Sequence, residues 1–143
     1  MIILDSINAI GHPLIQCTHS TTIELTKDDY LTKKGTCILG IKASKSCYDL
    51  NSVLKKKVKN GEKIDVVIKI DDITDSFYGY GNKNLTLLSK KDLVFRKSNY
   101  ICDRTILINC TKSSRELNRN IISKLTNSKK QISILFKVND TYE

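Results

Sequence analysis

The sequence is poor in the residues that break regular structure, with one proline and six glycines among 143 residues. Together with 40% apolar residues, this composition is typical of a globular chain and excludes a collagen-like or disordered one. A chain of this length buries roughly 68–70% of its unfolded surface as one domain, so its stability requires neither a disulfide nor a metal. We therefore expect one domain over residues 1–143.

Long apolar runs are also absent. Apolar runs such as residues 66–68 are far too short to cross a bilayer. The first ten residues, MIILDSINAI, carry no basic leader and include Asp5, which favours a first β-strand over a signal peptide. We expect a cytoplasmic protein with no membrane partner.

The cysteines form no Cys-x-x-Cys motif, and their number is odd: Cys17, Cys37, Cys47, Cys102 and Cys110. A secreted disulfide framework and a zinc ribbon both need close, paired thiols, so this pattern disfavours both. We interpret the cysteines as reduced thiols that act as small apolar residues.

Three motifs of nucleotide and acyl chemistry are missing as well. The sequence has no Gly-x-Ser-x-Gly, no Walker-type Gly-Lys-Ser/Thr loop and no Gly-x-Gly-x-x-Gly before a helix. Nucleotide hydrolysis and dinucleotide-dependent oxidoreduction are therefore disfavoured, and no cofactor is indicated.

Positive charge is abundant. Lysine and arginine number 24 against 15 acidic residues, a net charge of +9. Such a field attracts polyanions at long range and releases counterions on contact, which makes RNA the first partner to consider. The alternative is that lysine simply keeps the surface soluble.

An internal repeat organises the chain. Residues 43–50 (ASKSCYDL) match residues 110–117 (CTKSSREL), and each match continues into apolar residues spaced by four, as one face of a helix requires. Beyond these helices, residues 64–70 and 132–138 alternate apolar and polar side chains, the period of a half-buried strand. Gly61, in the link between them, suits a left-handed helix cap.

The repeat extends upstream, where residues 5–11 (DSINAIG) match residues 75–81 (DSFYGYG). Residues 24–31 (ELTKDDYL) also resemble residues 87–94 (LLSKKDLV). This alignment leaves the segment around His19 without a counterpart in the second half. The halves are then about 1–71 and 72–143.

Each half has one amphipathic helix and several one-sided strands, so each must bury its apolar faces against the other. We expect a mainly β (α+β) fold, a β-sandwich or partly closed barrel with antiparallel strands, a pseudo-twofold axis and two helices outside it.

The repeated Ser/Thr-Lys-Ser resembles a phosphate-binding sequence, but its context indicates a helix start. Ser46 with Asp49, and Ser113 with Glu116, have the spacing of a capping box. These carboxylates occupy the backbone donors that a phosphate would need. Lys45 and Lys112 could still hold a phosphate through their side chains alone.

Reactive side chains that only one half possesses are the candidates for chemistry. Both histidines, His12 and His19, lie in the first half, and Asn82 stands opposite His12. With Glu24 they could bind a divalent metal or act as acid and base. Alternatively, they are satisfied by hydrogen bonds in loops.

A second candidate site combines basic and aromatic residues of the second half. On β surfaces, cations around exposed aromatic rings bind unpaired bases and phosphates. The residues that fit this pattern are Lys90, Lys91, Arg96, Lys97, Tyr80 and Tyr100.

Several stretches also carry a family resemblance: GHP (11–13), THSTTIELTKDDYLT (18–32), GTCILGIKA (35–43), and DLVFRKS (92–98) with RTILI (104–108). In these the sequence resembles an archaeal family catalogued as domain of unknown function 371. The resemblance implies an archaeal intracellular protein with a mostly β, jelly-roll-like domain, and no activity, substrate or cofactor.

The chain departs from that family pattern at two places. Thr36 stands where the family has Asp, and residues 81–83 (GNK) stand where it has a second Gly-His-Pro. These departures weaken an enzymatic hypothesis more than a binding one. Our leading hypothesis is therefore a non-catalytic RNA-binding module, with the histidine-centred enzyme and a structural subunit of a protein complex as alternatives.

Overall fold

The structure is a computed structural model that describes residues 2–139. Strands make up most of its regular structure, with two short helices and two 3-10 turns. The elements in chain order are β1 (Ile2–Ile10), β2 (Thr22–Thr26), β3 (Ile38–Gly40), η1 (Cys47–Asp49), α1 (Ser52–Lys59), β4 (Lys63–Ile70), β5 (Ile73–Tyr80), β6 (Asp92–Arg96), β7 (Thr105–Leu107), η2 (Ser114–Glu116), α2 (Arg119–Leu125) and β8 (Gln131–Val138).

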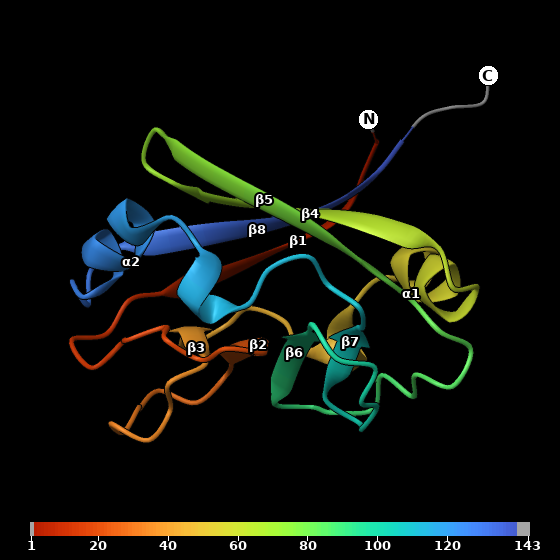
Figure 1. Cartoon of the computed structure of the whole chain (residues 1–143), viewed down its shortest axis with the longest axis horizontal. Helices are drawn as coiled ribbons and strands as arrows, with labels where there is room; N and C mark the ends of the chain where they lie inside the picture. The colour runs from red at the N-terminus through yellow and green to blue at the C-terminus, as the bar shows by residue number, and fades with distance from the viewer. Residues whose placement is uncertain (1, 140–143) are drawn as a thin grey trace.

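The strands form two four-stranded sheets that lie one above the other (Figure 1). Sheet A has the order β1-β8-β4-β5, and sheet B has the order β3-β2-β6-β7. Helices α1 and α2 lie at opposite ends of this sandwich (Figure 1). The predicted mainly β fold is confirmed. Over residues 2–139 the strands form two sheets and no closed barrel, although isolated β-bridges between Ile10 and Ile41 and between Tyr80 and Ile108 join the edges of the sheets.

The strands of the two halves are interleaved in sheet A. Strand β8 of the second half lies between β1 and β4 of the first, pairing antiparallel with both. The counterparts in the two halves are β1 and β5, β2 and β6, β3 and β7, and β4 and β8. Exchanging every strand for its counterpart gives each sheet the same strand order, read from the opposite edge. Because β8 separates β1 from β4, the first half alone cannot form its part of this sheet.

The core lies between the two sheets. In β4 the alternating residues Ile64, Val66, Ile68 and Ile70 are at most 1% exposed, which confirms the period-two prediction. Phe95 of sheet B packs edge-on against Phe77 of sheet A, with ring centroids 5.2 Å apart, and stacks on Phe136 at 6.0 Å. Burying each large apolar side chain stabilises the fold by roughly 1.5–3 kcal/mol.

Both α-helices begin after the capping boxes at which the sequence predicts them to start, α1 at Ser52 and α2 at Arg119. The Ser46–Asp49 capping box is present, but it begins the 3-10 turn η1. Leu50 then has extended backbone, and a separate cap follows, in which Asn51 Oδ1 accepts the N–H of Leu54 at 2.9 Å.

Both helices are short, and none of those within residues 2–139 has the length and apolar character that crossing a membrane requires.

The lysine of the repeated Ser/Thr-Lys-Ser binds the aspartate of the repeated Asp-Ser. Lys45 Nζ lies 2.6 Å from Asp5 Oδ1, and the same buried carboxylate accepts the backbone N–H of Asn51 at 2.8 Å. Lys112 and Asp75 repeat this contact, also at 2.6 Å. Each motif thus ties its 3-10 turn to a strand of sheet A, and its lysine is already paired with a carboxylate.

Backbone conformation shows which residues of the two halves correspond. Cys17 lies three residues after Leu14, and Leu87 lies three residues after Asn84, in matching loops. Both have positive φ, 52° and 54°. Lys42 and Asn109, just after the third strand of each half, have φ of 50° and 51°. Positive φ is uncommon in residues other than glycine, so its recurrence at matched positions fixes the alignment.

This alignment corrects one made from sequence. Residues 24–31 correspond to residues 94–101, rather than to 87–94, because β2 and β6 occupy equivalent places in sheet B. The shorter segment of the second half is the connection 97–104, which matches 27–37. His19 therefore keeps a counterpart, which is Ser89.

Two glycines hold the halves together at van der Waals distance. A Cβ on Gly81 would lie 1.8 Å from the carbonyl oxygen of Val58 at the end of α1. A Cβ on Gly11 would lie 2.3 Å from the carbonyl oxygen of Leu125 at the end of α2. Each glycine belongs to one half and contacts the helix of the other, and a backbone carbonyl can yield only if the helix moves.

We expect Gly81→Ala to lower the free energy of unfolding by about 3 kcal/mol or more, a typical cost of severe overpacking. Gly61→Ala is the matched control, because Gly61 has φ of +78° but open space around it, and should cost only about 1 kcal/mol. Urea unfolding of both variants measures the difference. Equal losses would show that the contact with Val58 is not tight.

Candidate functional site

The two histidines act as caps of tight turns. His12 Nδ1 accepts the backbone N–H of Leu14 at 3.0 Å. In the second half, Asn82 Oδ1 accepts the N–H of Asn84 at 2.9 Å. The departure from Gly-His-Pro at residues 81–83 therefore keeps the acceptor that this turn needs.

His19 has the same kind of role. Its Nδ1 accepts the backbone N–H groups of Thr21 at 3.1 Å and Thr22 at 3.2 Å. Its counterpart Ser89 accepts the N–H groups of two residues through Oγ, at 3.3 and 3.0 Å. The structure does not gather the histidines with Glu24, and residues 2–139 contain no group of three His, Cys, Asp or Glu side chains arranged to hold a metal ion.

Glu24 instead lies on the outer face of sheet B, where it meets a second carboxylate. Phe95 points from β6 into the core, so the alternating residues Asp92 and Arg96 lie on the opposite face. Arg104, from the connection before β7, has Nη1 3.6 Å from Glu24 Oε1 and 3.7 Å from Asp92 Oδ2. We call Glu24, Asp92 and Arg104 the carboxylate cluster.

The carboxylate cluster is short of hydrogen-bond donors. Arg104 lies beyond direct hydrogen-bond distance from both acids. Within the described residues, Glu24 Oε1 accepts only the weak S–H donor of Cys37, with Sγ at 3.4 Å. Asp92 Oδ1 is buried and, within residues 2–139, has no hydrogen-bond partner. Asp5, which is about equally buried, is bound by a lysine and a backbone N–H.

Burial raises the pKa of Glu24, and the neighbouring Asp92 raises it further, while Arg104 opposes both. A buried carboxyl with a raised pKa costs stability when it ionises, and such groups occur disproportionately at functional sites.

Next to the carboxylate cluster lies a group built around Arg96. Its Nε donates to Thr105 Oγ1 at 2.8 Å, and its guanidinium carbon lies 4.9 Å from the ring centre of Tyr100. Arg96 Nη2 also lies 3.4 Å from Cys102 Sγ. Burial raises the pKa of this thiol, but hydrogen bonds from the backbone of Arg104, from Thr105 and from Arg96 outweigh it and lower the pKa to about 7.

The other cysteines are free thiols as well. Cys17, Cys47 and Cys110 are buried, which confirms the interpretation for these three, and Cys37 and Cys102 are partly exposed. Burial raises the pKa of Cys17 to about 11 and of Cys47 and Cys110 to about 12.

The four predicted basic residues differ in whether their charge is available. Lys91 Nζ lies 3.2 Å from Asp28, and Lys97 Nζ lies 2.9 Å from Glu116, so both charges are paired. Lys90 takes part in none of the ion pairs found within residues 2–139. Its Nζ lies 5.0 Å from the ring centre of Tyr48, an aromatic residue that the sequence did not indicate.

Tyr48 is shared by two lysines. Lys55 Nζ, from α1, lies 5.1 Å from the same ring centre, and the tyrosine is 47% exposed. The backbone N–H of Tyr48 donates to the carbonyl of Ser89 at 3.0 Å, which holds η1 against the turn that carries Lys90. No local pattern in the sequence indicates this pairing, because the partners come from different halves.

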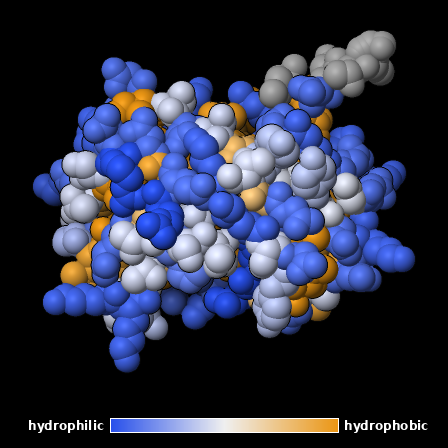
Figure 2. All heavy atoms as spheres, viewed as in Figure 1, coloured by the Kyte–Doolittle hydropathy of each residue, from blue (hydrophilic) through white to orange (hydrophobic). Residues whose placement is uncertain are grey.

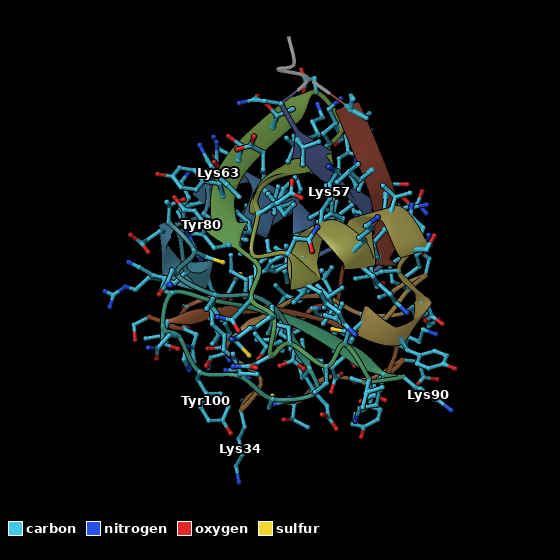
Figure 3. The ribbon with its side chains drawn as sticks, turned by 90° about the vertical axis from the view of Figure 1, so that its right-hand side faces the viewer. Lys34, Lys57, Lys63, Tyr80, Lys90 and Tyr100 are labelled. Atoms are coloured by element: carbon cyan, nitrogen blue, oxygen red, sulfur yellow. The ribbon has the colours of Figure 1, made fainter. Side chains whose placement is uncertain are left out.

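The tyrosines predicted to bind RNA are exposed, and the phenylalanines are not. Tyr80 is 38% and Tyr100 60% exposed, whereas Phe77 and Phe95 belong to the core. Figure 3 shows Tyr80 on the sheet A side with Lys63, its cross-strand partner, and Tyr100 at the sheet B end, with Lys34 and Lys90 at that end too. Tyr80 and Tyr100 thus lie on one side of the molecule without meeting.

The face of the molecule shown in Figure 2 is otherwise mostly hydrophilic. In the view of Figure 2, apolar side chains reach the surface only in small separate areas between polar ones. A two-sheet β protein with charged and aromatic side chains on its surface is the class that these features define.

Comparison with known proteins identifies the family. Residues 7–139 match the family described as Domain of unknown function (DUF371), and the chain belongs to this family, as its resemblance predicted. The chain is also 46% identical over 132 residues to an uncharacterized protein of Methanocaldococcus jannaschii. That match covers 92% of this chain and 96% of the relative.

We expect Glu24→Gln to stabilise the protein at neutral pH. Because the folded-state pKa of Glu24 is raised, its contribution to stability is present below the unfolded pKa and is lost as the pH rises through the folded one. Glutamine cannot ionise and so avoids this loss. Urea midpoints should be higher for the variant at pH 7 and converge towards wild type near pH 4. A lower midpoint at pH 7 would mean that Arg104 outweighs burial.

Proposed function

We propose that this protein is a non-catalytic, internally duplicated, jelly-roll-like domain that binds single-stranded RNA. The observation that carries the proposal is the pairing of cationic groups with tyrosine rings that reach the surface. The residues that we call the basic–aromatic surface are Tyr48, Lys55, Lys63, Tyr78, Tyr80, Lys90, Arg96 and Tyr100.

Charge supports an anionic ligand. The net charge is +9, and phosphate neutralisation releases counterions from the nucleic acid. Lys90 and Lys55 lie near one tyrosine, and Lys63 Nζ lies 4.1 Å from the ring centre of Tyr78. Within residues 2–139 these ammonium groups form no ion pair with a carboxylate, and Lys55 Nζ also donates to the carbonyl of Tyr48, so their charges remain available to phosphates.

Exposed rings support a single strand rather than a duplex. Bases stack on aromatic side chains only when they are unpaired, and each stacked base contributes roughly 1–3 kcal/mol. Tyr100, beneath the guanidinium of Arg96, and Tyr80, at the end of an edge strand of sheet A, present two such rings. A duplex would contact the lysines but leave these rings unused.

We expect a fluorescent single-stranded RNA to bind with an affinity that falls steeply as salt rises. Lys90→Ala should weaken binding and reduce the slope of log affinity against log salt by about 0.7, the value for one phosphate on a single strand. Lys91→Ala is the matched control, since its ammonium already pairs with Asp28, and its slope should equal that of wild type. Anisotropy titrations at several salt concentrations measure both.

Binding that does not change with salt would contradict the proposal, as would equal effects of the two lysine variants. Purification from the native host provides an independent outcome. Co-purification with one protein and without RNA would indicate a structural subunit of a complex.

A further inference from the structure

The carboxylate cluster includes a buried acceptor, Asp92 Oδ1, that no donor within residues 2–139 satisfies. The side chain of Asp92 is 8% exposed and that of Glu24 is 12% exposed. Asp92 Oδ1 has no partner within the described residues, and a buried acceptor left without a donor costs roughly 1–3 kcal/mol. The counterpart of Asp92 in the first half is Thr22, whose hydroxyl lies 3.0 Å from His19 Nδ1. The fold therefore does not require a carboxylate at this position, since the equivalent position in the first half holds an uncharged threonine.

The carboxylate cluster combines one donor group with two acceptor groups, and this combination limits which ligands could bind there. Arg104 offers planar N–H donors, and Glu24 and Asp92 offer carboxylate oxygens 3.6 and 3.7 Å from its Nη1. A complementary ligand presents two adjacent N–H groups to the acids and an acceptor to the arginine. Guanine alone among the four RNA bases has this edge, with its N1–H and N2 amino group beside O6.

The surroundings suit a base. Arg96 and Tyr100, which belong to the basic–aromatic surface, adjoin the cluster through Cys102, since Arg96 Nη2 lies 3.4 Å from its sulfur. The side chain of Arg104 is 45% exposed, and its contacts with the two acids are long ion pairs, which contribute little stability. Turning Arg104 outward therefore costs little and opens the two acids to a ligand.

We infer that Glu24, Asp92 and Arg104 form a guanine-selective site at the edge of the basic–aromatic surface. The inference rests on the proposed RNA binding and adds a base preference to it. The acids accept the N1–H and N2 amino protons, and the arginine donates to O6 or N7. Adenine, cytosine and uracil each place an acceptor where guanine has one of these donors, so they leave a buried carboxylate unpaired.

The test compares octauridine with octamers that carry one central guanosine, inosine or adenosine, each titrated against the full chain by anisotropy. Guanosine should bind roughly tenfold more tightly than adenosine, the discrimination of one good bidentate contact. Inosine lacks the N2 amino group and should fall between them. Glu24→Gln and Asp92→Asn should bring the guanosine-to-adenosine ratio close to one.

Glu62→Gln is the control, because Glu62 is a partly exposed acid outside the cluster and is paired with Lys57, and this variant should keep the wild-type ratio. Urea unfolding verifies that each variant is folded, as the removal of an unpaired buried charge should allow. Salt-dependent binding of octauridine with no guanosine preference would overturn this inference and leave the proposed function intact. A preference that survives both acid variants would also overturn it. No salt-dependent binding of any octamer would overturn the proposed function itself.

Discussion

The placement of β8 between β1 and β4 is the constraint on which the rest of the structure depends. Buried backbone groups of a β-strand need hydrogen-bond partners, and within the described part of sheet A the only strand beside β1 is β8 of the other half. The carboxyl ends of α1 and α2 then contact glycines of the opposite half at distances that admit no side chain. Neither half can therefore complete its own part of sheet A.

This shared frame allows the halves to differ in side chains without differing in backbone. Backbone N–H groups of Tyr48 and Arg115 donate to equivalent carbonyls, those of Ser89 and His19. Only the first position carries an aromatic ring between lysines. The same comparison makes the histidines unremarkable, since Asn and Ser replace them, and directs attention to Asp92, whose counterpart is an uncharged threonine.

Local patterns in the sequence predicted most of the fold. Alternation predicted β4 and β8, spacing by four predicted the apolar faces of α1 and α2, and Gly61 has the positive φ expected of a helix cap. The alignment of β2 with β6 was wrong because the shortened connection lies after β6, where the two sequences have little in common.

The site was harder to predict because its contacts join distant segments. Lys90 and Lys91 are neighbours with the same local sequence, yet one meets Tyr48 and the other Asp28. Only the pairing of β2 with β6 brings Glu24 near Asp92. The most direct test of the account is ultraviolet crosslinking of the protein to single-stranded RNA, with peptides mapped by mass spectrometry. Crosslinks should fall at Tyr48, Tyr80 and Tyr100, and crosslinks confined to other surfaces, or none above background, would contradict it.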